Sequence, residues 1–285
     1  ANGQRLKLGG AVVGDLVAGT GSVLEPAKGL AEVSMGGLTM NGTLQVALGT
    51  PGTVLVPGVS DKVAIAGNLV LGGASKLTLV DNAGAGSKGS FGAGRYLVGS
   101  YSGTRTGSFF TVENPSATTL HEKVVLDDAS GSLFVDAYRL ASAGVATSVT
   151  LAAVREGGTF EVAKLAVSNT ANADGFSEKL SVVLGVTTGD ATKSGSISLL
   201  AAGATDNTSL GLSLSQTTAA GTKSGTVAVQ LSSDGTGTSG YGSSLVETKT
   251  VNVGGTVYRL AVGTPATVSM NLGAVRRGGA LVTQD

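Results

Sequence analysis

The 285-residue chain contains no cysteine, no tryptophan and a single histidine, His121. Without a thiol it can form no disulfide, and it offers no thiolate as a nucleophile or metal ligand. One imidazole cannot complete the usual ligand sets of zinc or copper, and any catalytic pair that needs a histidine base has only this one. We therefore expect no cofactor and no transition-metal site.

Charged residues are also scarce, at 13% of the chain against about 25% in an average protein, and the net charge is zero. No cluster of lysine and arginine is long enough to follow a phosphate backbone, so nucleic acid is not an expected partner. No apolar run approaches the length of about 18 residues that a membrane helix needs, which predicts no transmembrane segment.

Glycine, by contrast, is abundant, with 46 residues, and 41% of the chain is hydrophobic. Valine, threonine, leucine and serine fill the intervals between the glycines. Because glycine costs a helix about 1 kcal/mol relative to alanine, and β-branched residues suit strands, this composition predicts an all-β protein. The apolar content is high enough to form a core rather than a disordered linker.

A short motif occurs twice at a fixed distance. Residues 137–141 read Ala-Tyr-Arg-Leu-Ala and residues 257–261 read Val-Tyr-Arg-Leu-Ala, while the segment 151–158 returns as 272–279. The two pairs of segments are offset by 120 and 121 residues. A repeat held at one period over two motifs is typical of tandem domains. The predicted domain-junction residues are Tyr138, Arg139, Tyr258 and Arg259.

Residues 1–140 read as short strands separated by glycine turns. Similar segments begin at Gly14, Gly42 and Gly67, at spacings of 28 and 25 residues. Short strands that return at near-constant intervals are typical of a parallel β-helix, in which each coil buries its inward side chains against the next. We therefore predict a β-solenoid (β-helix-like) domain over residues 1–140. An up-and-down sandwich with similar turn spacing is the alternative.

The segment Ser60–Gly73, followed by Gly94–Val98 and Tyr101–Phe109, resembles the end of a bacterial autotransporter-type passenger. In that family such segments form the last coils of a right-handed β-helix displayed at the cell surface. The resemblance covers roughly residues 10 to 140. It implies an extracellular or bacterial cell-surface location.

Residues 141–262 show seven alternating runs separated by glycine, asparagine, aspartate and serine turns. This pattern predicts an Ig-like β-sandwich. The segments Val167–Ala171, Asp174–Glu178 and Ser233–Gly240 resemble the tandem Ig-like repeats of large bacterial surface proteins, which implies spacing, assembly or adhesion and no catalytic residue. The runs are Val149–Val154, Phe160–Val167, Leu180–Val186, Ile197–Leu200, Leu210–Leu214, Thr226–Leu231 and Thr248–Val253.

Acidic residues are the remaining candidates for catalysis or calcium binding. Asp127 and Asp128 are adjacent, and neighbouring strand residues point to opposite faces, so we expect a solvated turn rather than a paired acid site. Asp174 and Asp234 each precede glycine, and tight turns need the same residues that calcium would, so we predict turns there. His121 lies in a polar connection and is expected at the solvated surface. We predict no catalytic, cofactor-binding or metal site.

Residues 263–285 repeat the first strand of the module. A strand with this alternation has unpaired backbone groups and a wet apolar face, so it will seek a sheet, and the simplest partner is another copy of the chain, joined head to tail. The alternative is that a longer polypeptide continues into a further repeat. The residues predicted to form this assembly strand are Val268, Met270, Leu272, Val275 and Leu281.

Together these features predict an extracellular structural protein that self-assembles into a filament, sheath or surface layer. The alternative function is an adhesin or stalk segment of a larger bacterial surface protein, which contacts an extracellular matrix or cell surface through its loops. Self-assembly requires a partner groove on the same chain, whereas an adhesin stays monomeric. A polysaccharide-cleaving solenoid enzyme would need two acids at a defined separation, and the sequence identifies no such pair.

Overall fold

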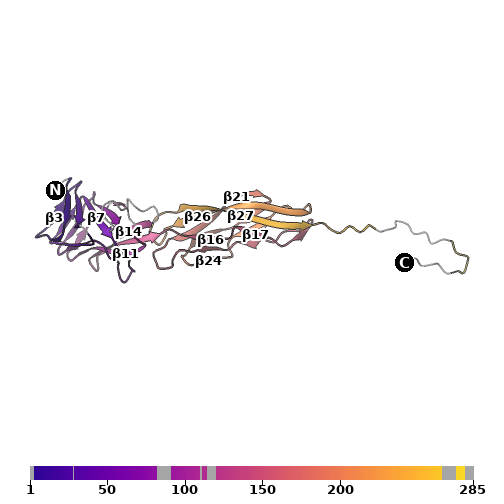
Figure 1. Cartoon of the computed structure of the whole chain (residues 1–285), viewed down its shortest axis with the longest axis horizontal. Coiled ribbons are helices and arrows are strands. Elements are labelled where there is room, and N and C mark those ends of the chain that lie inside the picture. Colours follow the sequence, from indigo (N-terminus) through magenta and orange to yellow (C-terminus); the bar gives the residue numbers. More distant parts are fainter. Residues whose placement is uncertain are drawn as a thin grey trace.

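The computed structural model describes residues 3–27, 29–81, 91–109, 111–113, 120–264 and 274–279. All regular elements among these residues are β-strands, and the described part of the chain contains no helix. The predicted all-β class is therefore confirmed. The strands form an elongated molecule, with β3 near one end and β17 and β27 near the other (Figure 1).

The first half of the chain passes through three sheets in turn. Every third strand joins the same sheet, and neighbouring strands from β1 to β13 run parallel. One sheet contains β1 (Arg5–Leu8), β4 (Val23–Pro26), β7 (Thr43–Leu48), β10 (Lys76–Asp81) and β13 (Thr111–Glu113). The second contains β2 (Gly10–Ala11), β5 (Glu32–Met35), β8 (Lys62–Ile65) and β11 (Gly94–Tyr101), and the third contains β3 (Leu16–Ala18), β6 (Leu38–Met40), β9 (Leu69–Leu71) and β12 (Arg105–Thr106).

Leucines stack in register from one turn of the chain to the next. Leu16, Leu38 and Leu69 pair in succession in the third sheet, whereas Leu44 belongs to the first sheet, where it pairs with Leu24. The similar segments that begin at Gly14, Gly42 and Gly67 therefore do not belong to one sheet. The true spacing is 22 residues from Leu16 to Leu38 and 31 from Leu38 to Leu69, because an insertion at residues 49–60 lengthens the third turn.

Alternate residues of these strands are buried in one apolar cluster, and buried polar side chains connect neighbouring turns. The Asp61 carboxylate accepts hydrogen bonds from the N–H groups of Ala31 and Ala47 at 2.9 and 2.8 Å. Burial raises the pKa of the Asp61 carboxyl, although the two N–H donors act in the opposite direction. The Ser75 hydroxyl donates to the Met40 carbonyl at 2.6 Å. The bonds to Ala31 and Met40 join neighbouring turns of the chain, whereas the bond to Ala47 closes the long third turn on itself.

An antiparallel hairpin closes this half of the molecule. It consists of β14 (Leu120–Asp127) and β15 (Ser132–Arg139), and β15 pairs antiparallel with β11. The Arg95 guanidinium on β11 binds the buried Asp136 carboxylate of β15 through two bonds of 2.7 Å. The change from parallel to antiparallel pairing ends the stacking of successive turns on this sheet.

The second half of the chain forms one large and two small sheets. The large sheet has the order β17 (Ser148–Thr150), β27 (Ser244–Tyr258), β26 (Gly221–Asp234), β21 (Lys179–Gly189) and β23 (Ser196–Leu200), and β18 (Val154–Arg155) also pairs with β27. The small sheets are β16 (Ala143–Val145), β20 (Val167–Asn169) and β24 (Thr205–Asp206), and β19 (Ala163–Lys164), β25 (Gly211–Leu214) and β22 (Ala191–Ser194). Pairing is antiparallel except where β17 and β18 run parallel to β27.

The apolar residues of these three sheets form a second cluster, separate from the first. Asn169 is fully buried within this half, and all of its amide groups are bonded. Its Nδ2 donates to the carbonyls of Glu178 and Leu200, each at 3.1 Å, and its Oδ1 accepts from the N–H groups of Ser142 and Ala171, each at 3.3 Å. This side chain thereby ties together strands that are distant in sequence.

The first cluster ends at Ala137 and the second begins at Ala141. We call residues 3–139 the N-terminal body and residues 141–258 the C-terminal body. They lie end to end along the long axis of the molecule (Figure 1). That each is an independent domain, with boundaries after residues 140 and 262, stays a prediction.

The predicted assembly strand falls largely outside the described residues. Val275 is described and is 47% exposed. The other four residues, Val268, Met270, Leu272 and Leu281, lie outside the described ranges.

Candidate functional site at the junction of the two bodies

The chain crosses from one body to the other at Arg139, the last residue of β15. The Arg139 N–H donates to the Phe176 carbonyl at 3.0 Å, and the Arg139 carbonyl accepts from the Glu178 N–H at 2.9 Å. These two bonds form a short parallel bridge between Arg139 and Ser177. The end of the N-terminal body is therefore paired with the backbone of the C-terminal body.

The Arg139 side chain reinforces the same connection. Its guanidinium donates to both carboxylate oxygens of Asp174, at 2.7 and 2.8 Å, and to the Ser177 hydroxyl at 2.9 Å. Partial burial raises the pKa of the Asp174 carboxyl, but the guanidinium and the Phe176 N–H outweigh burial, so the pKa lies below its usual value. The Asp174 carboxylate therefore binds both the Phe176 N–H of its own turn and the Arg139 guanidinium.

Tyr138 and Arg139, the first pair of predicted domain-junction residues, are the last two residues of β15. The Tyr138 ring is buried and lies 5.8 Å from the Phe176 ring, between centroids. The second pair, Tyr258 and Arg259, lies at the far end of the C-terminal body, where Tyr258 ends β27 and is 60% exposed. The two copies of the motif therefore mark the two ends of the C-terminal body.

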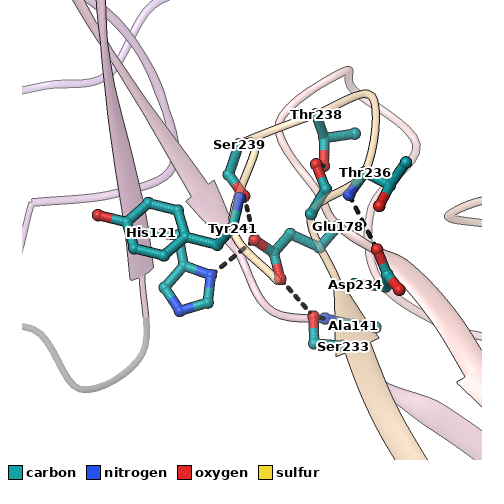
Figure 2. A network of polar contacts seen from close by, with 10 residues as sticks. His121, Ala141, Glu178, Ser233, Asp234, Thr236, Thr238, Ser239 and Tyr241 are labelled. Atoms are coloured by element: carbon teal, nitrogen blue, oxygen red, sulfur yellow. Dashed lines mark hydrogen bonds and ion pairs between the residues drawn. The ribbon is translucent and has the colours of Figure 1, made fainter. Parts of the chain in front are cut away.

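A buried carboxylate organises the interior of the junction (Figure 2). Glu178 is completely buried, and its Oε2 accepts a hydrogen bond from the Ser233 hydroxyl at 2.6 Å. Its Oε1 accepts from the Ser239 hydroxyl and lies 2.6 Å from Nδ1 of His121. Ser233 in turn accepts from the Ala141 N–H at 2.8 Å. Because three donors surround the carboxylate, its removal from water is compensated by hydrogen bonds.

His121 differs from the sequence expectation of a solvated surface residue. It lies on β14, pairs with Tyr138 of β15, and its side chain is only 24% exposed. The Tyr241 ring stacks on the imidazole, with 4.3 Å between centroids and 13° between planes. Burial, followed by the charges of Glu122 and Glu178, raises the pKa of Tyr241. The imidazole is the N-terminal body's contribution to the Glu178 network (Figure 2).

The network contains serine, histidine and an acid, but it lacks the connections of a hydrolase triad. In a triad the serine hydroxyl donates to the imidazole, and the acid binds the other ring nitrogen. Here Ser233 and Ser239 both donate to Glu178, which also contacts His121, and Tyr241 covers the imidazole. This geometry holds segments of the two bodies together and does not activate a serine.

The other acids named in the sequence lie where strands end in turns: Asp127 ends β14, Asp128 follows it, and Asp234 ends β26. Asp127 accepts from the Ser130 hydroxyl at 2.7 Å, whereas Asp128 binds the Arg105 guanidinium through two bonds of 2.6 Å, so the adjacent carboxylates serve different partners. Asp234 accepts from the Thr236 N–H at 2.9 Å, which closes the turn expected from its sequence.

No three His, Cys, Asp or Glu side chains among the described residues are grouped so that they could hold a metal ion. Over the same part of the chain, no helix has the length and hydropathy required to cross a membrane.

Sequence reasoning missed Glu178, Ser233 and Ser239 as junction residues. All three lie in the segments on which the Ig-like resemblance rests, residues 174–178 and 233–240, and the structure brings these segments together at the carboxylate. No local motif identifies the contact, because 55 residues separate Ser233 from Glu178 and 57 separate His121 from Glu178.

No protein-family model matches this chain, and no curated protein matches it. Among solved structures, the CooA pilin subunit from enterotoxigenic Escherichia coli aligns with 48% of this chain and 99% of that chain. The identity is 14% and the TM-score is 0.24. A likeness at this level shows neither a shared fold nor a shared function.

Proposed function

We propose that this chain is an extracellular structural protein whose N-terminal body is a β-solenoid and whose C-terminal body is an Ig-like sandwich. Copies join head to tail through residues 263–285 and form a filament, sheath or surface layer. The proposal rests on one observation. Residues 263–285 repeat the sequence that forms β17 and β18, and the position of these two strands in the C-terminal body indicates what such a sequence can pair with.

In the C-terminal body those first strands lie along the edge of β27. Ser148, Val149 and Thr150 of β17 pair in parallel with residues 252–254, and β18 pairs with Val257 and Tyr258. Both pairings are short, at three and two residues. A segment with the same pattern from a second copy can therefore exchange with them at low cost, as in domain swapping.

Four of the five predicted assembly residues correspond to buried or partly buried positions in the first strands of the C-terminal body and the segment that follows them. At the repeat offset of 121, Leu272 corresponds to Leu151 and Leu281 to Phe160, and both of these positions are buried. Met270 and Val275 correspond to the partly buried Val149 and Val154. Val268 corresponds to the exposed Thr147. Burying such apolar side chains contributes about 1.5 to 3 kcal/mol each, so a swapped strand has a substantial driving force.

The junction supports a structural role in a second way. Backbone pairing, the contact of Arg139 with Asp174 and the Glu178 network fix the two bodies end to end. Because the two bodies are fixed relative to each other, successive head-to-tail contacts along an assembly would keep a constant relative orientation. The Tyr258–Arg259 copy of the junction motif stands at the end where the next contact would begin.

The first test compares the 1–285 chain with a version truncated after Val262, by light scattering and negative-stain microscopy. We expect polymers from the full chain and none from the truncated chain. A matched pair of full-length variants separates strand insertion from loss of chain length. Met270→Asp with Leu272→Asp should abolish polymers, whereas Ser269→Asp with Asn271→Asp, on the alternate positions, should retain them.

Monomers from every version would contradict assembly and favour the second candidate, an adhesin or stalk segment of a longer surface protein. The observation that favours this candidate is the same repeated junction, because Tyr258 and Arg259 stand where a following module would dock. If two copies exchanged residues 263–285 reciprocally, they would form a closed dimer. That result would support the strand contact but contradict a filament, sheath or layer.

A further inference from the structure

Two turns, one in the C-terminal body and one near the end of the chain, have the same conformation. In residues 155–158 and again in residues 276–279, the N–H of the last residue donates to the carbonyl of the first at 2.9 Å. The third residues, Gly157 and Gly278, have φ of +79° and +92°. A type II turn requires such a φ at its third residue, and glycine adopts it without steric cost. The end of the chain therefore repeats the local structure of the module as well as its sequence.

The second of these turns has this conformation although it is exposed. All the described residues of the range 274–279 are exposed, and a Cβ on Gly278 would meet no atom within 4 Å. A segment that already has its bound conformation loses less entropy when it binds. We call residues 155–158 the resident turn and residues 276–279 the incoming turn.

Three hydrogen bonds join the resident turn to the rest of the C-terminal body. The Glu156 N–H donates to the Tyr258 carbonyl, and the Gly157 N–H donates to the Thr217 carbonyl, each at 2.9 Å. The third bond is made by a side chain, because Oε1 of Glu156 accepts from the Ala220 N–H at 2.8 Å. Two of the three bonds therefore hold the connection between β25 and β26.

The incoming turn can reproduce the two backbone bonds but not the third. At the repeat offset of 121, Arg277 corresponds to Glu156 and Gly278 to Gly157. Both have the backbone N–H that the first two bonds need. Arginine, however, has five N–H donors and no acceptor, so it cannot replace the carboxylate that binds the Ala220 N–H. An exchange of the two turns would therefore place one donor against another.

We propose that Glu156 and Arg277 determine which segment occupies the edge of β27. Glu156 retains the chain's own residues 148–158, and Arg277 makes the C-terminal segment of a second copy the weaker competitor for the same position. This inference deepens the proposed function and rests on it, because it assigns the residues that regulate strand exchange. Specificity is a difference between two affinities, so a penalty against one segment is as effective as an added contact to the other.

The size of this penalty follows from the lost hydrogen bond. A bond between an N–H and a carboxylate is stronger than one between neutral groups. Because the bond from Ala220 to Glu156 is only partly buried, it should favour the resident turn by about tenfold, the lower end for a bond to a charged group. Such a difference keeps the resident turn in place in dilute solution. Assembly then begins only where copies of the chain accumulate.

Substitutions in the full-length chain test this selection. Arg277→Glu gives the incoming turn an acceptor for the Ala220 N–H, so the concentration at which polymers form, measured by light scattering, should fall about tenfold. Glu156→Ala removes the acceptor from the resident turn and should lower that concentration by a similar factor. The double variant should show both effects, about a hundredfold together.

The matched control is Arg276→Glu, which makes the same change of charge one residue away. Arg276 corresponds to Arg155, an exposed residue, so the wild-type residue is the same in both turns. This variant should polymerise at the wild-type concentration. An equal fall for Arg276→Glu and Arg277→Glu would overturn the proposal, since charge alone would then explain it. So would an unchanged concentration for Arg277→Glu, which leaves strand exchange itself intact.

Amide exchange tests the retaining role of Glu156 without any assembly. In dilute, unassembled chain, Glu156→Ala should accelerate exchange of the Leu151 and Gly157 N–H groups about tenfold, because the resident turn opens more often. Glu161→Ala removes an exposed acid just beyond the turn and should leave both groups unchanged. Equal protection in the wild type and in Glu156→Ala would contradict retention by the carboxylate.

A labelled peptide of residues 263–285 separates the failure of this inference from the failure of the proposed function. It is added to full-length chain below the concentration for polymerisation, and binding is followed by fluorescence anisotropy. The Arg277→Glu peptide should bind about tenfold more tightly than the wild-type peptide. Equal binding of the two would overturn the selection and support strand exchange. Binding of neither peptide, with no polymers from any chain, would contradict strand exchange and this inference with it.

Discussion

The two bodies connect their strands over very different distances along the chain. In the N-terminal body a strand pairs with the strand three positions away, as β7 does with β4 and β10. In the C-terminal body β17 pairs with β27, and Ser148 and its partner Asn252 lie 104 residues apart. One body is built by adding turns, whereas the other is complete only when β17, near its start, pairs with β27, its last strand.

This difference determines how far the effect of a destabilising substitution extends through each body. A stack of turns behaves as a series of nearest-neighbour contacts, so a local defect weakens the adjacent turns most. A body closed by distant strands loses several contacts together and unfolds cooperatively. Buried polar groups follow the same division. Asp61 bonds to the backbone of its own turn and of the preceding one, whereas Glu178 binds side chains from three separate segments.

The largest effect is expected from Glu178→Ala. It leaves the buried donors of His121, Ser233 and Ser239 without an acceptor, and removing one partner of such a buried network costs about 3 to 5 kcal/mol. Urea denaturation should show this loss, and amide exchange should show it across the whole C-terminal body. Glu178→Gln keeps one acceptor oxygen and should recover part of the stability.

The matched control is Glu247→Ala, which removes a carboxylate that is 51% exposed on the same large sheet. It should change the free energy of unfolding by no more than about 0.5 kcal/mol. A Glu178→Ala protein as stable as this control would show that the network does not hold the junction.

The second prediction concerns Leu77 of β10, which is fully buried and pairs with Leu44 of β7 and Val112 of β13. Leu77→Ala should cost about 2 to 5 kcal/mol through lost burial and the cavity it leaves. Amide exchange should accelerate most in the turns on either side. Val229→Ala, in the centre of the large sheet, should instead accelerate exchange throughout its body. Uniform acceleration in both variants would contradict the difference between the bodies.

The third prediction separates the bodies without unfolding either. Arg139→Ser removes the guanidinium that binds Asp174 and Ser177 but keeps the backbone bridge. Because the pair is partly exposed, its loss should cost only about 0.2 to 1 kcal/mol. Small-angle scattering should detect a wider range of molecular dimensions than in the wild type. Arg259→Ser, at the far end, is the control and should leave the scattering of an unassembled chain unchanged.

The comparison also explains what the sequence could and could not predict. In the C-terminal body, five of the seven predicted runs each fall on a single strand, since alternation over several residues reports directly on a half-buried strand. The other two runs, Val149–Val154 and Phe160–Val167, are each divided between two short strands. The short strands β16, β22 and β24 were not predicted, because two to four residues carry too little pattern. In the N-terminal body the repeating character was recognisable, but the pattern around Leu44 resembles that around Leu16 and Leu69 although Leu44 lies in a different sheet.

The junction was predictable only in part. Tyr138 and Arg139 could be found because their motif occurs twice. Their partners in the C-terminal body belong to no repeated motif, because the role of Asp174, Phe176 and Glu178 depends on which distant segments the fold brings together. His121 looked like a surface residue for the same reason: a polar local sequence does not report a buried acid supplied by the other body.

The smallest effects should come from two exposed aspartates, one in each body, whose pKa is lowered to about 2 for different reasons. For Asp128 the main cause is the Arg105 guanidinium, followed by the Tyr101 hydroxyl. For Asp206 the main cause is the Ser209 hydroxyl, followed by the N–H groups of Ser209 and Thr208.

A pKa that is lower in the folded protein stabilises the fold above the usual value of 3.8, and this contribution is lost as the pH falls toward about 2. Asp128→Asn and Asp206→Asn should therefore each be slightly less stable than wild type at pH 6, and the difference should disappear near pH 2. Salt distinguishes the two causes. At 1 M NaCl the effect of Asp128→Asn should shrink, because an exposed ion pair is screened, whereas that of Asp206→Asn should persist, because its partners are uncharged. Equal salt sensitivity, measured by chemical denaturation at both ionic strengths, would show that Asp128 is held by its neutral donor, Tyr101, rather than by Arg105.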